Sequence, residues 1–181
     1  MKVFVILTDG CEEIEAVSPI DILRRAGIDV TTVSITKKKQ VKGSHDIIIE
    51  ADAMFEECDF KKGDMLVIPG GPGTSSYGIH KELIGLLTDY FNKGKWIASI
   101  CAAPTILGKL GLLKGKKAIC YPGMECDLEG AAVEYDSKVV VDGNLITSKG
   151  PGTAVDFSLK IVECLLGNDA VKTLKEKMVI G

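Results

Sequence analysis

Residues 2–35 read KVFVILTDGCEEIEAVSPIDILRRAGIDVTTVSI, and the order of apolar and polar residues in them indicates the fold class. Lys2–Thr8 is a nearly continuous apolar run, which is typical of a strand covered on both faces. Glu12–Gly27 places apolar residues at helical spacing and ends at a glycine, so it predicts a helix that Pro19 either kinks or starts. Ile28–Ile35 predicts a second strand. A strand, a helix and a strand in this order favour a parallel pair.

The same alternation continues along the rest of the chain. Further strands are predicted at Asp46–Asp52, Asp64–Gly71, Lys95–Ile100 and Lys116–Pro122, and further helices at Lys81–Gly94, Ala102–Gly111, Gly152–Gly167 and Asn168–Ile180. Ser137–Gly150 holds two β-rich runs joined by Asp142-Gly143, which is a strong hairpin signal. The sequence therefore predicts a single α/β domain over residues 1–181, with a mostly parallel sheet, helices on both faces and a β-hairpin.

Composition narrows the function classes. The 181 residues carry a net charge of -3, and the largest basic cluster is Lys37–Lys39, which argues against a nucleic-acid partner. No apolar run reaches the roughly 18 residues of a membrane span, and the N-terminus reads as a strand rather than a signal peptide. We therefore expect no membrane partner and a cytoplasmic location. The glycine-rich stretches match neither a P-loop nor a dinucleotide fingerprint, so no cofactor is expected.

The six cysteines are expected to be reduced, because the chain has no secretory signal and is long enough to build a core. No CxxC pair occurs, and the two histidines, His45 and His80, have no ligand-like spacing to the cysteines. A metal site is therefore not expected. Neither histidine has a context that places it beside a reactive thiol, so each is interpreted as a surface residue.

Cys101 is the first candidate for chemistry, because it falls where a strand gives way to a helix. Three motifs, TDGCEEIE, IPGGPG and SICAAP, follow predicted strands and should meet at the carboxyl edge of a parallel sheet, where ligands bind. A sharp turn at Cys101 would expose the thiol to the N-terminal end of the next helix, and this setting lowers a thiol pKa. Position alone leaves open whether Cys101 is a nucleophile or an inert buried residue.

Glu15 and the glycines of Ile68–Gly78 favour the nucleophile. A carboxyl beside a partly buried thiol has a raised pKa, so Glu15 can hold a proton and later transfer it. Glu12 and Glu13 fit better as solvated residues of a first helical turn. The backbone amides of the glycine-rich stretch, including Gly70 and Gly71, can form an oxyanion pocket with the Ala102 amide. The alternative for that stretch is a plain turn.

Four ordered motifs together resemble the ThiJ/PfpI superfamily, and in particular its DJ-1-like branch. These motifs are GCEEIEAVSPIDILRRAG, VIPGGPG, ASICAAPTIL and DGNLITSKGPGTAVDFSLKIVE, and the similarity spans nearly the whole chain. The resemblance implies a flavodoxin-like three-layer sandwich, a homodimer and a reactive cysteine on a nucleophile elbow. By position, Cys101 matches the oxidation-prone nucleophile, Glu15 its protonated partner, and Gly71 and Ala102 the pocket amides. Lys149, Gly150 and Pro151 match a loop near the site or the dimer contact.

Two departures from the family pattern affect the function. Relatives with glyoxalase activity carry a histidine where this chain has Tyr121, and the protease-like branch carries a histidine where this chain has Ala102. Peptidase activity is therefore the least favoured function. Two others stay open: an enzyme acting on small reactive carbonyls, like glyoxalase III or a protein deglycase, and a non-enzymatic redox sensor or chaperone based on Cys101. The missing histidine favours the second modestly, and Tyr121 is expected to line the substrate pocket.

Overall fold

A computed structural model describes residues 1–181 and contains a central sheet of seven strands in the order β10-β11-β7-β6-β1-β2-β5. In chain order these strands are β1 (Lys2–Leu7), β2 (Asp29–Ser34), β5 (Ala53–Met54), β6 (Met65–Ile68), β7 (Trp96–Ile100), β10 (Val139–Asp142) and β11 (Leu145–Ser148). All neighbours are parallel except β10 and β11, which form the predicted hairpin around Asp142-Gly143. The predicted fold class is confirmed.

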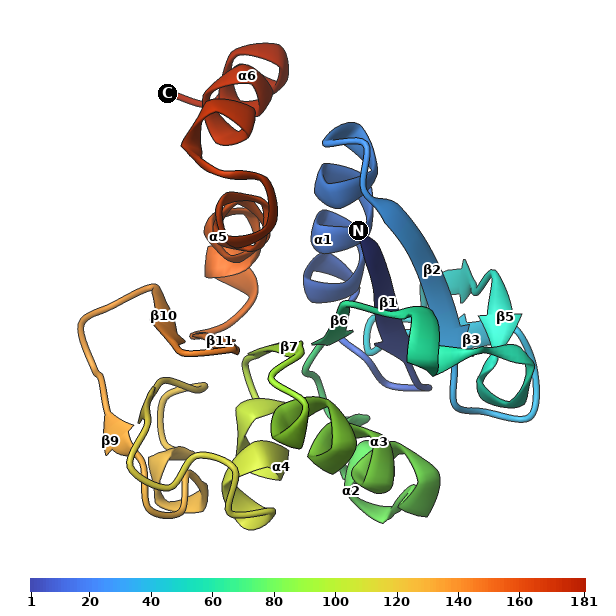
Figure 1. Cartoon of the computed structure of the whole chain (residues 1–181). Coiled ribbons are helices and arrows are strands. Elements are labelled where there is room, and N and C mark those ends of the chain that lie inside the picture. Colours follow the sequence, from blue (N-terminus) through green and yellow to red (C-terminus); the bar gives the residue numbers. More distant parts are fainter.

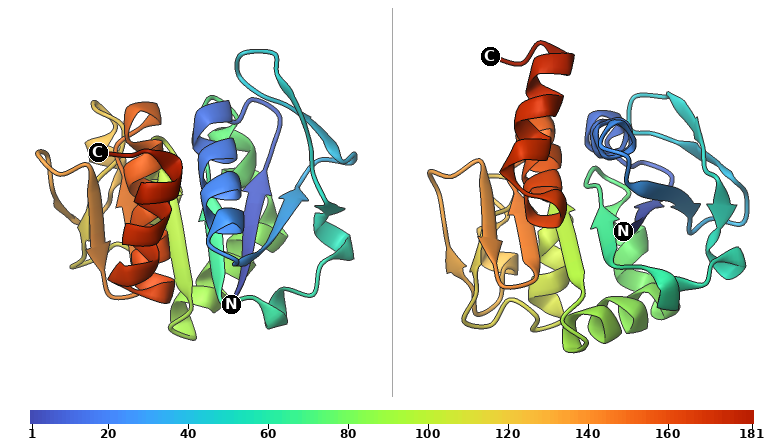
Figure 2. Two further views of the ribbon diagram at one scale, coloured as in Figure 1. Left: turned by 90° about the horizontal axis from the view of Figure 1, so that it is seen from above. Right: turned by 45° about the horizontal axis from the view of Figure 1, so that its top comes forward.

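Helices cover both faces of this sheet (Figure 1). One face carries α1 (Glu13–Arg25) and α5 (Ala154–Leu166), and α6 (Asn168–Met178) packs on α5. The other face carries α2 (Thr74–Ile79), α3 (Lys81–Asn92) and α4 (Pro104–Lys109), as the turned views in Figure 2 also show. None of these helices combines the length and the apolar character needed to cross a membrane.

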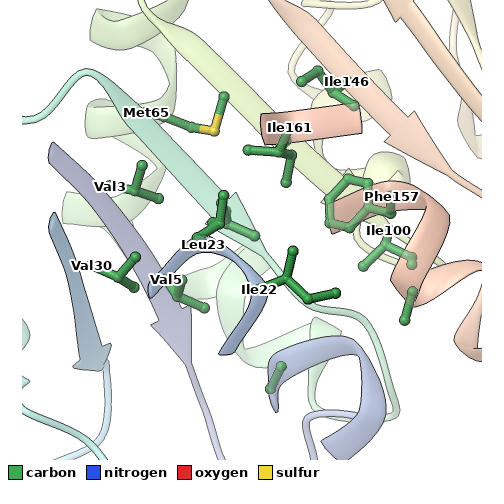
Figure 3. Packing of buried hydrophobic residues seen from close by; sticks show 14 of the residues in the cluster. Val3, Val5, Ile22, Leu23, Val30, Met65, Ile100, Ile146, Phe157 and Ile161 are labelled. Carbon is green, nitrogen blue, oxygen red and sulfur yellow. The ribbon is translucent and has the colours of Figure 1, made fainter. Parts of the chain in front are cut away.

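The first core layer lies between the sheet and the pair α1 and α5 (Figure 3). Ile22 and Leu23 from α1 and Phe157 from α5 pack there against the inward side chains of the central strands. A second buried cluster lies on the opposite face, between the sheet and α2, α3 and α4. Each fully buried side chain of this size contributes about 1.5–3 kcal/mol, so the two clusters hold the strand ends in fixed positions.

Several short elements differ from the sequence-based prediction. The strand predicted at Asp46–Asp52 is only β4 (Ile48–Glu50), which pairs with β3 (Gln40–Lys42) in a separate antiparallel hairpin. The strand predicted at Lys116–Pro122 is reduced to β8 (Lys117–Ala118), because it pairs only with the two-residue β9 (Ala132–Val133). The glycine-rich stretch after β6 contains α2, where no helix was predicted.

Candidate active site

The three motifs predicted to meet at one edge of the sheet do meet there. The Glu12 N–H donates to the Gly70 carbonyl at 3.0 Å, which joins the loop after β1 to the loop after β6. The Cys101 N–H donates to the Ser148 carbonyl at 2.9 Å, which joins the end of β7 to the end of β11. A cavity of about 770 Å³ opens at this edge, and Gly71, Cys101 and Ala102 contribute to its wall.

Cys101 occupies a left-handed backbone conformation, with φ of +63°. Such a conformation is strained for a residue with a Cβ and persists only where the surroundings enforce it. Both backbone groups of Cys101 are held, because its carbonyl also accepts a hydrogen bond from the Tyr121 N–H at 2.8 Å. The turn directs the side chain to the cavity wall, where the residue is 8% exposed.

Glu15 projects from the first turn of α1 into the same edge and is fully buried. Its Oε2 accepts a hydrogen bond from the Gly70 N–H at 2.8 Å, and its Oε1 has no hydrogen-bond partner. Burial raises the pKa of Glu15 to about 7, although the Gly70 donor and Cys101 act in the opposite direction. The predicted direction of this pKa is therefore confirmed. A carboxyl with this pKa exchanges its proton readily near neutral pH.

The pKa of Cys101 moves in the direction opposite to the prediction. Burial and the adjacent Glu15 charge raise it to about 12, and the Gly71 and Ala102 amides lower it only in part. The N-terminus of the next helix lowers the pKa of the thiol little, because α4 has only six residues and begins at Pro104. The thiol and the carboxyl therefore titrate as a coupled pair that gives up its first proton near pH 7.

Gly70 and Gly71 differ in what they supply. A Cβ on Gly70 would lie 2.7 Å from the Cys101 Cβ and 2.8 Å from Glu15 Oε2, so the lack of a side chain brings these two residues together. Its amide serves Glu15, which corrects the prediction that Gly70 contributes an amide to the cavity. Gly71, with φ of +95°, does direct its amide toward the Cys101 sulfur.

The remaining predicted residues lie at different distances from the thiol. Tyr121 and Pro151 line the cavity, and the Tyr121 side chain is about half exposed. Gly150 is buried behind the Tyr121 ring, which an added Cβ would approach to 3.3 Å. Lys149 is not part of the cavity wall, because its ammonium group donates to the Tyr135 carbonyl at 2.6 Å.

Glu12, the residue before α1, and Glu13, its first residue, are less solvated than predicted. Glu13 is buried and accepts hydrogen bonds from the His45 N–H at 2.7 Å, from His45 Nδ1 at 2.9 Å and from Ser44 Oγ at 3.1 Å. Ser44 Oγ also contacts Glu12 at 3.0 Å, and Glu12 lines the cavity. Glu12, Glu13 and His45 each bring one potential metal-ligand atom within 4.8 Å of the others, and hydrogen bonds within the group already use these atoms.

Comparison with known proteins identifies the family. The model of the DJ-1/PfpI family matches residues 1–164, which contain Glu15, Cys101 and all the other predicted site residues. The chain belongs to the DJ-1/PfpI family. The resemblance found in the sequence motifs is thus confirmed over nearly the whole chain.

Three DJ-1/PfpI proteins illustrate the similarity. Protein dj-1beta of Drosophila melanogaster is 43% identical over 179 residues, which cover 98% of this chain and 96% of that protein. A protein of Pyrococcus abyssi named a deglycase is 32% identical over 166 residues, which cover 91% of this chain and 99% of the relative. The structure of oxidized DJ-1 from Toxoplasma gondii has a TM-score of 0.93 at 34% identity, covering 98% of this chain and 97% of that chain.

Sequence reasoning missed one part of the site, which is the far wall of the cavity. Ile79, Ile84 and Leu110 line it, and they come from α2, from α3 and from the residue after α4. The sequence signal was weak, because α2 is a short helix inside a glycine-rich stretch. Apolar residues of α3 and α4 also fit an ordinary buried helix face.

Proposed function

We propose that this chain is a DJ-1-like stress protein that acts on small reactive carbonyl compounds, with Cys101 as nucleophile and Glu15 as proton carrier. The observation that supports this most directly is the pairing of a buried thiol with a carboxyl whose pKa is about 7, beside two amides that face the sulfur. The deglycase name of the Pyrococcus relative agrees with a carbonyl substrate.

The first step is addition of the thiol to an aldehyde. The Cys101 sulfur forms a bond to the aldehyde carbon as the carbonyl π bond breaks, and ionised Glu15 accepts the thiol proton. The oxygen of the hemithioacetal then carries negative charge, and the amides of Gly71 and Ala102 are in place to stabilise it. A raised thiol pKa is compatible with this step, because the proton leaves only as the new bond forms.

The second step converts a 2-oxoaldehyde into a 2-hydroxy acid without an external oxidant. Protonated Glu15 first gives the thiol proton to the hemithioacetal oxygen and so becomes a carboxylate again. It then removes the proton from the former aldehyde carbon and returns it to the neighbouring carbon, while the hydroxyl proton moves to the second oxygen, so one carbon is oxidised and the other reduced. The resulting thioester of Cys101 is cleaved by water, which releases the acid and regenerates the thiol. Methylglyoxal and water give lactate in this sequence, and all atoms and electrons balance. Tyr121 lies in the cavity wall and can donate a hydrogen bond to the second oxygen.

The experiment is to incubate the purified protein with methylglyoxal and to measure lactate. We expect turnover that is abolished in Cys101→Ser and reduced at least 100-fold in Glu15→Gln, because general acid–base groups contribute about 10²–10⁴ in rate. Ser76→Ala, a substitution outside the cavity wall, serves as the matched control and should retain the rate. Lactate formation that persists in Cys101→Ser at the unmodified rate would rule out the proposal.

A second candidate function is a redox sensor or chaperone, favoured by the two amides that face the Cys101 sulfur. Those amides and protonated Glu15 can stabilise a sulfinate formed by oxidation. The test is mass spectrometry after graded peroxide treatment. Oxidation of Cys101 ahead of exposed Cys126 would support the sensor, whereas earlier oxidation of Cys126 would exclude it. The raised thiol pKa favours the carbonyl enzyme, because the thiolate is the form that peroxide oxidises.

We further propose that residues 1–181 fold as one domain and form a homodimer in the cytoplasm. The support for a dimer is an exposed apolar patch formed by Ile14, Val17, Ile47 and Ile48. These residues are neighbours, because the Ile47 N–H donates to Glu13 at 3.4 Å and so brings the β3–β4 hairpin onto the start of α1. Light scattering of the wild type and of Val17→Asp tests the assembly, and an unchanged mass in the variant would argue against this interface.

A further inference from the structure

The cavity extends well beyond Cys101. Besides Cys101, its wall includes Ile79 of α2, Ile84 of α3, Ile106 of α4 and Leu110, the residue after α4. A volume of about 770 Å³ lies in the range of about 300–1,000 Å³ that holds drug-sized ligands. A three-carbon dicarbonyl bound at Cys101 would leave most of this space unfilled. The apolar far wall would therefore not be contacted by so small a substrate.

The charges along the cavity limit what can fill it. Its wall contains three charged side chains, namely Glu12, Lys109 and Asp127. Lys109 and Asp127 neutralise each other in an ion pair of 3.0 Å, and Glu12 lies at the end near Cys101. The far end therefore offers no free cation to a phosphate or carboxylate and no free anion to an amine. The apolar wall at that end therefore favours the binding of an uncharged apolar group.

We propose that the carbonyl compound accepted by Cys101 carries an uncharged alkyl or aryl substituent, which lies in the groove between α2 and α4. This inference rests on the proposed function, because it assigns the substrate class of the same thiol. The substituent would replace water against Ile84 and Leu110 while the aldehyde carbon reaches the sulfur. Because burial of each methylene contributes about 0.8 kcal/mol, even partial burial of a hexyl chain gives about a tenfold preference over a methyl group.

One test compares 2-oxooctanal with methylglyoxal as substrates, with the corresponding 2-hydroxy acid as the measured product. We expect kcat/KM to be at least tenfold higher for 2-oxooctanal in the wild type. Ile84→Ser and Leu110→Ser should each reduce that ratio about threefold or more. Leu166→Ser is the matched control, because Leu166 is exposed and lies outside both the cavity wall and the proposed dimer patch. Equal kcat/KM for the two aldehydes would overturn the proposal.

A second measurement does not require turnover. Alkylation of Cys101 by N-hexyl iodoacetamide and by iodoacetamide is followed by peptide mass spectrometry, and each rate is divided by the rate with glutathione. We expect the hexyl reagent to be favoured about tenfold at Cys101, and less so in Ile84→Ser. A hexyl preference without lactate or hydroxy-acid formation would refute the proposed enzyme and keep the groove. Turnover of methylglyoxal without any hexyl preference would refute the groove and keep the enzyme.

Discussion

Replacing Glu15 with glutamine should change the pH profile of Cys101 alkylation in shape as well as in magnitude. In the wild type, the pair gives up its first proton near pH 7, because the pKa of Glu15 is about 7. Above that pH the ionised carboxylate opposes formation of the thiolate, so the alkylation rate should level off. In Glu15→Gln this opposition is absent, and the rate should keep rising tenfold per pH unit until the thiol itself has titrated.

The structure gives the size of the effect. The Cys101 Cβ lies 2.7 Å and Glu15 Oε2 2.8 Å from the point where a Gly70 Cβ would be, so these two atoms are at most about 5.5 Å apart. For two unit charges about 5 Å apart, an effective dielectric constant of about 20 gives a repulsion of about 3 kcal/mol, which corresponds to about two pH units. The wild-type rate should therefore be level from about pH 7 to about pH 9. The two proteins should react alike at pH 6, and the variant about tenfold faster at pH 8.

The assay is the second-order rate of iodoacetamide alkylation from pH 5.5 to pH 9.5, resolved for each cysteine by peptide mass spectrometry. Exposed Cys126 provides an internal reference that should rise steadily with pH in both proteins. Glu12→Gln is the matched control, because the Glu12 charge only adds to the raised pKa of Glu15. That variant should keep the level region and begin it at a slightly lower pH.

A wild-type rate that rises in parallel with that of Glu15→Gln through pH 8 would contradict this prediction. It would mean either that Glu15 does not titrate near pH 7 or that its charge does not reach the sulfur. Circular dichroism of Glu15→Gln would show whether the variant is folded. A folded variant with unchanged slope would leave no role for the carboxyl in controlling the thiol.

Two further predictions concern stability. Gly70→Ala should lower the free energy of unfolding by about 1–3 kcal/mol in urea titrations, because its Cβ would lie 2.7 Å from that of Cys101, while Gly85→Ala, with open space around it, should not destabilise. Glu13 should stabilise the fold above pH 4.5: burial would raise its pKa, but His45 and Ser44 lower it from 4.5 to about 2. This contribution to the free energy of unfolding is present above the pKa of Glu13 in the unfolded chain and should be lost as pH falls from about 4.5 to about 2. We expect the loss to be roughly 1 kcal/mol, because solvent screens the interaction of Glu13 with exposed His45. Glu13→Gln should lack this pH dependence.

The fold was largely predictable because its signals are local. Lys2–Thr8 and Asp64–Gly71 are apolar runs of strand length, and Glu12–Gly27 has a helical pattern with a glycine stop. Each pattern also agrees with the packing on both faces of the sheet, so local preference and tertiary burial act together. Lys116–Pro122 has the same strand-like character and still forms only two residues of strand. Its pairing depends on β9, a distant partner that the local pattern does not reveal.

The site was predictable in position and less so in electrostatics. Cys101 and Glu15 follow strand ends, and parallel topology alone brings them to one edge. The pKa of Cys101 depends on how deeply the thiol is buried and on its separation from Glu15, and neither quantity can be read from spacing. Glu13 illustrates the same limit, because its burial depends on His45 in a hairpin about thirty residues away. The helical pattern of the sequence predicts that the first turn is exposed, and it contains no information on the hairpin that covers Glu13.

The raised thiol pKa bears on the choice between the two functions. A sensor benefits from a standing population of thiolate, which this pair suppresses at neutral pH because Glu15 ionises before Cys101. A carbonyl enzyme benefits from a small population of thiolate, because a thiol that loses its proton only during addition is protected from oxidants between turnovers. The strained φ of Cys101 and its two backbone hydrogen bonds hold the sulfur in place for that concerted step. The raised pKa of the thiol is thus compatible with the carbonyl reaction, and the order in which peroxide oxidises Cys101 and Cys126 decides whether Cys101 also senses oxidants.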